Sequence, residues 1–292
     1  MRIRDLFTGD GPVFSFEFFP PKTDEGERKL LETVRRLKEL RPGFVSVTKT
    51  GAKPAEKTIE ITARIKHELG IEAMAHMTCA TAGRAEMRRL FELIRDAGIE
   101  NVLALRGDPP RDQPTFVRPP DGFDYACELV RFIREHGYGF CLGGAGYPET
   151  HPECPTAELD LANLKCKVDA GAEFVITQLF YENARFFAFV DRARAAGITV
   201  PIVPGIMPIT NVAQIERIAA LSGARIPPAL QRDLDAARGD DAAALQVGVA
   251  YATTQCRELL AAGVPGVHFY TLNQSPATSA ILRALRAEQA AS

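Results

Sequence analysis

The amino-acid sequence predicts an α/β protein built as a (β/α)8 TIM barrel. Three observations carry this prediction: eight short apolar runs recur along the 292 residues, longer amphipathic segments separate them, and no GxGxxG follows an early run. Strands that alternate with helices pair in parallel through right-handed crossovers. Eight such units in about 250 to 300 residues fit a closed barrel. A doubly wound sheet, the alternative, usually carries the missing glycine motif.

The predicted strands are apolar almost throughout, which is typical of a parallel sheet covered on both faces. In chain order they span residues 13–18, 43–48, 72–78, 100–106, 139–145, 173–180, 199–206 and 266–272. After the first strand, apolar side chains recur at helical intervals from Leu30 to Leu40, and Thr23 or Asp24 can cap that helix. An Ala-Gly pair precedes four later strands, and glycine there permits the left-handed residue that closes a helix.

The segment before the eighth strand, residues 225–263, is longer than one helix needs. It predicts an extra helix followed by the last barrel helix. No linker, low-complexity tract or short repeat interrupts the chain, so we expect a single domain over residues 1–292.

The composition excludes several classes of protein. With 35 basic and 37 acidic residues the formal charge is −2, which argues against a nucleic-acid binder, because such proteins need a basic excess. No apolar run approaches the roughly 20 residues that span a bilayer, and the first residues lack the apolar segment of a secretory signal. The six cysteines form no CxxC pair. We therefore expect reduced thiols, a cytoplasmic location and no membrane partner.

Active sites of such barrels lie at the carboxyl ends of the strands, so polar residues there carry the functional prediction. The first strand ends at Glu17, between aromatic residues. Loss of hydration beside aromatics predicts a raised pKa, as for a general acid. The alternative is a barrel-interior glutamate paired with Lys or Arg.

Two other strand ends suggest chemistry that we weigh lower. Lys49 follows the second strand and could form a Schiff base, although a solvated loop lysine is the simpler interpretation. His76 and Cys79 end the third strand, but zinc usually takes three or four protein ligands at recognisable spacing. We therefore expect no metal site.

The fourth and fifth strands lead into segments suited to a flat, anionic ligand. Arg106, Gly107 and Asp108 form a turn in which glycine allows close backbone approach and arginine can bind phosphate or carboxylate. Tyr147 and His151 follow a glycine-rich strand. The simpler interpretations are a local Arg–Asp ion pair and an ordinary tight turn.

Later elements add amide and hydroxyl groups. Asp160, Asn163 and Lys167 share one helix face, which alone is usually a solvated face. Gln178 ends the sixth strand and can both donate to and accept from a heteroaromatic ring, or it can be a satisfied core amide. Tyr270 ends the eighth strand, where core filling is the default. Together these residues predict a mouth for a large, partly anionic small molecule.

Nine strings, in order along nearly the whole chain, resemble the methylenetetrahydrofolate reductase family. They are FSFEFFPPK (14–22), FVSVT (44–48), AHMTC (75–79), LALRGDPP (103–110), YPETHPE (147–153), DLANLKCKVDAGA (160–172), ITQLFY (176–181), PGIMPIT (204–210) and HFYTLN (268–273). The length is similar to that of the short bacterial form. The resemblance implies a barrel that holds FAD non-covalently and reduces 5,10-methylenetetrahydrofolate to 5-methyltetrahydrofolate with NADH or NADPH in a ping-pong cycle. It also implies a homo-oligomer.

The resemblance also assigns roles to matching positions. Glu17 matches the general acid that helps to open the methylene bridge to an iminium ion, and Asp108 matches an acid near the flavin and the pterin. The positions that match FAD contacts are Thr48, His76, Arg106, Gly107, Asp108, Tyr125, Ala126, Tyr147, His151, Asp160, Asn163 and Lys167. The positions that match substrate contacts are Glu17, Gln178, Gln214 and Tyr270.

The chain departs from the family pattern at three places. The loop KTGAKPAEKT (49–58) lacks a tyrosine and is apparently one residue shorter, Cys166 replaces an arginine that contacts FAD in some relatives, and Ile218 replaces a stacking phenylalanine. An aromatic face contributes about 0.5–1.5 kcal/mol beyond area burial, so we expect weaker substrate binding rather than lost chemistry. A Schiff-base lyase using Lys49 and a non-catalytic folate- or flavin-binding relative remain the alternatives.

Overall fold

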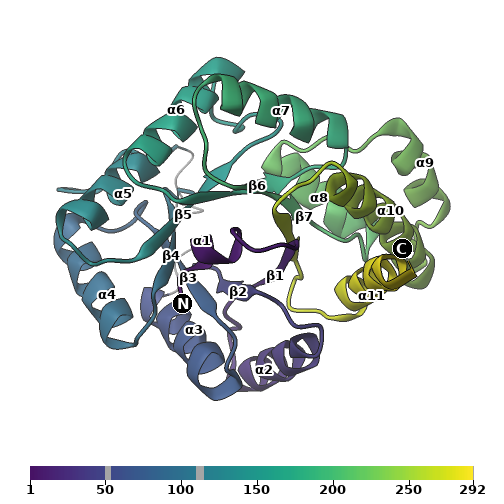
Figure 1. Cartoon of the computed structure of the whole chain (residues 1–292), viewed down its shortest axis with the longest axis horizontal. Helices are drawn as coiled ribbons and strands as arrows, with labels where there is room; N and C mark the ends of the chain where they lie inside the picture. The colour runs from purple at the N-terminus through teal and green to yellow at the C-terminus, as the bar shows by residue number, and fades with distance from the viewer. Residues whose placement is uncertain (50–53, 110–114, 292) are drawn as a thin grey trace.

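The computed structural model, which describes residues 1–49, 54–109 and 115–291, confirms the predicted barrel (Figure 1). Eight parallel strands close in sequence order, from β1 to β8 and back to β1. Each strand lies within about three residues of its predicted limits. The strands are β1 (Val13–Phe18), β2 (Phe44–Val47), β3 (Ala73–Thr78), β4 (Asn101–Leu105), β5 (Cys141–Gly146), β6 (Phe174–Leu179), β7 (Ile202–Ile206) and β8 (Gly266–Tyr270).

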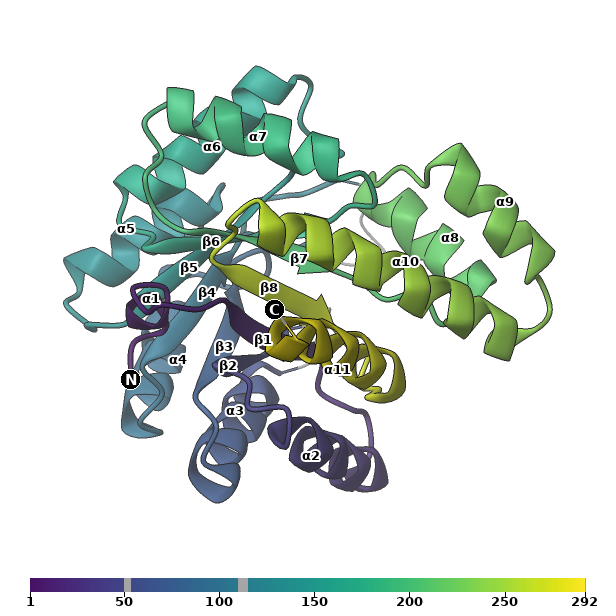
Figure 2. The ribbon, with the colours of Figure 1, turned by 45° about the vertical axis from the view of Figure 1, so that its right-hand side comes forward.

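Helices surround the barrel (Figure 2), and three of them come between β7 and β8 along the chain. They are α1 (Ile3–Leu6), α2 (Asp24–Lys38), α3 (Ala55–Leu69), α4 (Arg84–Asp96), α5 (Ala126–Glu135), α6 (Ala157–Asp169), α7 (Asn183–Ala195), α8 (Val212–Ser222), α9 (Pro228–Ala236), α10 (Asp241–Ala261) and α11 (Pro276–Ala291). The predicted extra helix is α9, and it is followed by α10. Helices α1 and α11 were not predicted from the sequence.

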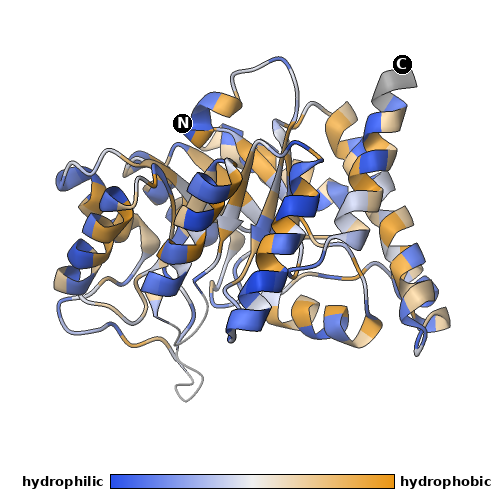
Figure 3. Ribbon diagram, turned by 90° about the horizontal axis from the view of Figure 1, so that it is seen from below, coloured by the Kyte–Doolittle hydropathy of each residue, from blue (hydrophilic) through white to orange (hydrophobic). Residues whose placement is uncertain are grey.

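The hydropathy of the helices explains why they form and where they pack. The Thr23 side chain accepts a hydrogen bond from the backbone N–H of Gly26 and so caps α2, as predicted. Apolar residues at helical spacing, among them Leu30 and Val34, are buried against the outer face of the barrel. Figure 3 shows the same division along several helices, with apolar and polar residues on different faces. No helix in the described ranges is long and apolar enough to cross a membrane.

The amino-terminal segment covers one end of the barrel. Ile3 is fully buried, and its backbone N–H donates to the Asn101 side chain at 2.8 Å. Ile3 joins a core cluster with Phe44 and Phe174, with Leu6 packed against it. Because Asn101 is the first residue of β4, this contact places α1 at the amino ends of the strands. The amino-terminal segment leaves the opposite end of the barrel uncovered. The carboxyl ends of the strands lie there, where the active site is expected.

We expect Glu27→Gln to lower the free energy of unfolding by about 1.5–3 kcal/mol at neutral pH. The Glu27 carboxylate is 8% exposed and pairs with Lys57 and Arg64 of α3. Burial raises its pKa, but these two cations outweigh burial and hold the pKa below its ordinary value of 4.5. A lowered pKa in the folded state adds stability above about pH 4.5, and this stability is lost as the pH falls through the lowered value.

Urea unfolding at pH 7 and in acid measures this difference. The control is Glu32→Gln, in which the lost carboxylate is 60% exposed and pairs with Arg36. We expect it to change stability by less than about 1 kcal/mol. Equal losses in the two variants, or a loss at Glu27 that persists in acid, would contradict the assignment.

Candidate active site

The strand register directs one carboxylate into the barrel mouth. Glu17 pairs with Ser46 of β2 and Tyr270 of β8. Successive side chains of a strand point to opposite faces, so Phe16 and Phe18 point away from Glu17. Both phenylalanines are fully buried in the core cluster that the barrel shares with its helices.

The contacts of Glu17 within the described residues fall on one carboxylate oxygen. Its Oε2 lies 3.4 Å from His268 Nε2, 3.5 Å from Ser46 Oγ and 3.5 Å from His76 Nε2. The side chain is 17% exposed. Oε2 therefore faces groups from three strands, while Oε1 has none of these contacts.

The predicted pKa of Glu17 is wrong in direction. Burial raises this pKa, but attraction by His76 and the hydrogen bond and charge of His268 outweigh burial, and Ser46 adds a further hydrogen bond, so the pKa is lowered. The prediction treated neighbours in the sequence as neighbours in space. The partners are also histidines rather than the Lys or Arg of the alternative interpretation.

At neutral pH His76 contributes an uncharged imidazole to this site, and it attracts the Glu17 carboxylate only once it is protonated in acid. It is 4% exposed, and burial lowers its pKa to about 4, although Glu17 opposes the shift. Its Nε2 has no hydrogen-bond partner among the described residues, so a buried polar atom faces the mouth unsatisfied. No group of three His, Cys, Asp or Glu side chains in the described ranges could hold a metal ion.

The turn after β4 brings a cation to the mouth. Gly107 has φ +85°, a conformation that favours glycine, and a Cβ there would lie 2.8 Å from the Thr78 side chain. Arg106 Nη2 pairs with Glu153 at 2.7 Å, and its guanidinium lies 5.0 Å from the Phe116 ring centroid. The arginine thus contacts the loop after β5, rather than making the local pair with Asp108 that we considered.

The loop after β5 and helix α6 supply a second group of polar side chains. The Tyr147 and His151 rings meet edge to face at 4.6 Å, and the His151 backbone N–H donates to Asp160 Oδ2 at 3.2 Å. Lys167 donates to the carbonyl of Ala145. Burial raises the pKa of Tyr147 to about 12, raises that of Asp160 and lowers that of Lys167.

These predicted cofactor residues converge on one part of the mouth. The pKa of His151 is lowered by burial and responds to Arg106, Asp160 and Lys167, and that of Tyr147 responds to Asp108. Asn163 lies on α6 between Asp160 and Lys167. Tyr125 and Ala126 stand at the start of α5, with Tyr125 53% exposed.

The residues fit a flat ligand with an anionic portion. Thr48 Oγ1 is buried without a hydrogen-bond partner in the described part of the chain, as is His76 Nε2, and both atoms would find partners in a polar ligand. Arg106 and Lys167 supply the positive charge that a phosphate requires.

The predicted substrate residues lie on the other side of the mouth. Gln178 is half-buried on β6, and its Oε1 accepts from the backbone N–H of Leu179 at 2.9 Å. Gln214 is exposed in the first turn of α8, one turn before the half-buried Ile218. Tyr270 directs its hydroxyl to the carbonyl of Thr177, at 2.6 Å.

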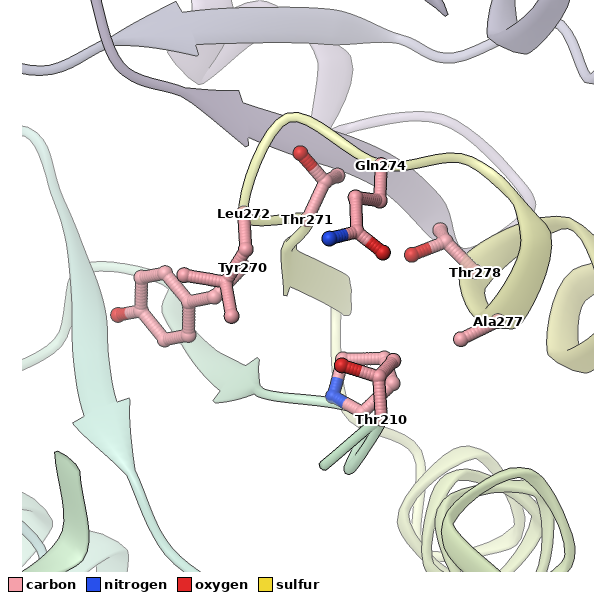
Figure 4. Close-up of a pocket in the computed structure, with 8 residues that line it drawn as sticks. Thr210, Tyr270, Thr271, Leu272, Gln274, Ala277 and Thr278 are labelled. Atoms are coloured by element: carbon pink, nitrogen blue, oxygen red, sulfur yellow. The ribbon is translucent and has the colours of Figure 1, made fainter. Parts of the chain in front are cut away.

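A small cleft between the loops after β7 and β8 adjoins Tyr270 (Figure 4). It is lined by Pro208, Thr210, Tyr270, Thr271, Leu272, Gln274, Ala277 and Thr278. Figure 4 shows Gln274 and Thr278 turned toward each other at the start of α11, while the Tyr270 hydroxyl points away from them. The tyrosine ring therefore forms a wall of the mouth, and its hydroxyl serves to fix it.

Sequence reasoning missed the polar groups deeper in the barrel. Ser15, Ser46 and His268 are fully buried, and all three belong to the hydrogen-bonded group around Glu17. One signal in the sequence could have found them. Each lies on a predicted strand at a position whose side chain points into the barrel, as that of Glu17 does. Thr271, whose hydroxyl donates to the Glu17 carbonyl at 2.6 Å, was likewise not singled out.

The departures from the family pattern lie at the edges of this site. Lys49 is half-buried, which lowers its pKa, while Glu56 opposes the shift. Residues 50–53 of the altered loop lie outside the described residues. Cys166 is half-buried on α6, beside Lys167 in the chain.

Comparison with known proteins identifies the family. The model of the family described as methylenetetrahydrofolate reductase matches residues 2–286. The chain is 42% identical to methylenetetrahydrofolate reductase (NADH) 1 of Arabidopsis thaliana, over 96% of this chain and 49% of that protein. It is 40% identical to 5,10-methylenetetrahydrofolate reductase of Pectobacterium carotovorum, over 93% of this chain and 89% of that protein.

A solved structure agrees with the fold. An uncharacterised protein from Clostridium thermocellum, described as binding two copies of 5-methyl-5,6,7,8-tetrahydrofolic acid, aligns over the full length of both chains with a TM-score of 0.68 at 15% identity. The chain spans about half the length of the plant relatives that it matches. The match over residues 2–286, together with the bacterial relative, shows that this chain belongs to the methylenetetrahydrofolate reductase family.

Proposed function

We propose that the protein reduces 5,10-methylenetetrahydrofolate to 5-methyltetrahydrofolate, with NADH or NADPH as the reductant and bound FAD between the two half-reactions. Family membership supports the reaction. The structural observation that carries the proposal is the placement of Glu17 on β1, across the closed barrel from β5 and the polar groups that follow it. A flat ligand against Tyr147 and Lys167 would thus face a carboxyl group over the mouth.

Most of the residues that would hold FAD follow β4 or β5 or lie on α6. Arg106 and Lys167 suit its phosphates, and Thr48 and His76 offer unpaired buried polar atoms. When bound, FAD supplies the two-electron chemistry, taking a hydride from the nicotinamide and delivering it to the folate. Asp108 adds negative charge near this group, as the family resemblance suggests.

Glu17 would supply the proton. The contacts on Oε2 leave Oε1 for the folate amine that leaves as the methylene bridge opens to the iminium ion. Flat rings that cover the mouth would displace water and raise the pKa of the carboxyl from its lowered value. The proton would then move from Glu17 to the substrate, and the carboxylate would remain with His268 and Ser46.

The quaternary state follows from the same resemblance, and the cellular location from the composition and the scattered cysteines. We propose a cytoplasmic homo-oligomer in which residues 1–292 form one catalytic domain. Light scattering of the purified protein gives its mass in solution, which we expect to exceed the 31.9 kDa of one chain.

An absorbance spectrum of the purified protein tests the cofactor and the reductant. We expect a flavin spectrum that bleaches when NADH or NADPH is added without oxygen, and the two rates give the preferred nicotinamide. A colourless protein that does not take up added FAD would contradict the proposal.

Two alternatives have distinct outcomes in the same preparation. A Schiff-base lyase would trap a carbonyl substrate on Lys49 when borohydride is added, and the half-buried amine is the observation in its favour. A non-catalytic relative would bind flavin or folate without any catalysed bleaching.

A further inference from the structure

A fully buried polar group lies directly behind Glu17 and extends the contacts of its Oε2 into the barrel. It consists of Ser15 on β1, Ser46 on β2 and His268 on β8, each 0% exposed. The register pairs Ser15 with His268 and Glu17 with Ser46, so the four side chains point into the same part of the barrel. Burying three polar side chains costs free energy unless they are hydrogen-bonded, and here they bond to one another and to Glu17.

His268 is fixed in one orientation. Its Nδ1 lies 2.8 Å from Ser15 Oγ, and its ring stacks on Phe44 with centroids 5.9 Å apart and planes at 17°. The Tyr270 ring meets its edge at 5.5 Å. These contacts leave Nε2 pointing to Glu17 Oε2 at 3.4 Å and to Ser46 Oγ at 3.4 Å.

This pairing suits both protonation states of the carboxyl group. When Glu17 is ionised, His268 Nε2 can carry a hydrogen and donate to Oε2, while Nδ1 accepts from the Ser15 hydroxyl. When Glu17 is protonated on Oε1, the oxygen turned to the substrate, Oε2 is a carbonyl oxygen and still accepts from Nε2–H. The Ser15 hydroxyl donates to Nδ1 in both states, so one tautomer serves the carboxyl group before and after it gives up its proton.

We propose that His268, held by Ser15, is the positioning residue that fixes Oε2 of Glu17 in the barrel, turns Oε1 to the substrate and stabilises the carboxylate left after proton donation. The role deepens the proposed function and rests on it. No new reactant is needed, since the proton that leaves Glu17 goes to the folate amine.

The other groups that face Glu17 do not supply this support. His76 reaches Oε2 from β3 at 3.5 Å without a hydrogen bond, and Ser46 adds an uncharged donor from β2. Tyr270 lies beside Glu17 on β8, but its hydroxyl is already used by Thr177. No lysine or arginine contact to Glu17 occurs among the residues described. His268 is therefore the one imidazole in this group with a hydrogen bond to the carboxylate and a second partner behind it.

The titration of Glu17 itself tests the proposal without any substrate. Isotope-edited infrared spectra of the purified protein, minus those of Glu17→Gln, isolate its carboxyl band across the pH range. In His268→Leu we expect the midpoint to rise by about one pH unit, because a donor to the carboxylate is lost. Ser15→Ala, a small change that folding should tolerate, is expected to raise the midpoint by a smaller amount. His268→Gln keeps an amide donor and should return the midpoint most of the way to that of the unaltered protein.

Single-turnover kinetics supply the second measurement. In His268→Leu we expect oxidation of the reduced flavin by methylenetetrahydrofolate to slow by about 10- to 100-fold, while flavin reduction by NADH stays within about twofold. The matched control is His67→Gln, which changes an exposed histidine of α3 that contacts the Ala97 carbonyl at the end of α4, and it should change neither rate.

The outcomes separate this proposal from the proposed function. An unmoved midpoint in both His268→Leu and Ser15→Ala overturns the role of His268, whatever the kinetics show. Equal slowing of both half-reactions also overturns it, because it indicates a general structural loss. If the midpoint moves but the unaltered protein does not react with methylenetetrahydrofolate, the proposed function fails while the coupling of His268 to Glu17 stands.

Discussion

Glu17→Gln is expected to slow the oxidation of the reduced flavin by methylenetetrahydrofolate by about 10²- to 10⁴-fold, the range typical of a lost general acid. Reduction of the flavin by NADH should stay within about twofold. The amide has the shape of the carboxyl group and can still bond to His268 and Ser46, but it has no proton of suitable acidity to transfer. Anaerobic stopped-flow absorbance measures each half-reaction by itself.

The control for this experiment is Glu32→Gln, the same substitution at an exposed position on α2. It should leave both rates unchanged. If Glu17→Gln slowed both half-reactions to a similar extent, or neither, Glu17 would not be the proton donor of the folate half-reaction.

Gly205→Ala is expected to lower the free energy of unfolding by about 1–3 kcal/mol and to displace Tyr270. A Cβ at this position on β7 would lie 2.2 Å from the carbonyl oxygen of Thr177 and 2.7 Å from the Tyr270 hydroxyl. The first of these atoms belongs to the backbone of the adjacent strand and can move only with that strand. The hydrogen bond from Tyr270 to Thr177 would therefore be distorted, and the wall of the mouth with it.

Thermal unfolding and the Michaelis constant for methylenetetrahydrofolate measure the two effects. A loss of this size corresponds to a melting point lower by about 2–4 °C per kcal/mol in a protein of this size. Gly11→Ala is the matched control, since a Cβ there has no atom within 4 Å, and it should change neither quantity. Identical behaviour of the two alanine variants would show that Gly205 has no special packing role.

The sequence predicted the strands well because they are parallel and buried on both faces. Apolar runs such as residues 13–18 are then continuous, and helices punctuated by glycine separate them. Helix α1 is too short to show a helical period. Helix α11 does show one, at Ile281, Leu282 and Leu285, all buried in the core, so its omission was avoidable.

The site was predicted less completely, for a reason of geometry. Polar residues at strand ends can be located from the order of the strands along the chain. In the structure Arg106 and Lys167 lie close enough to His151 to influence its pKa, as that order implies. The surroundings of Glu17 depend on neighbouring strands instead. Its aromatic neighbours in the chain point outward, and the groups that set its pKa come from β2, β3 and β8.

The most direct test is anaerobic mixing of the NADH-reduced protein with 5,10-methylenetetrahydrofolate. We expect the flavin absorbance to return and one 5-methyltetrahydrofolate to form for each flavin reoxidised, at a rate that Glu17→Gln reduces. A flavin that remains bleached in the unaltered protein, with no methyl product, would contradict the proposed reaction.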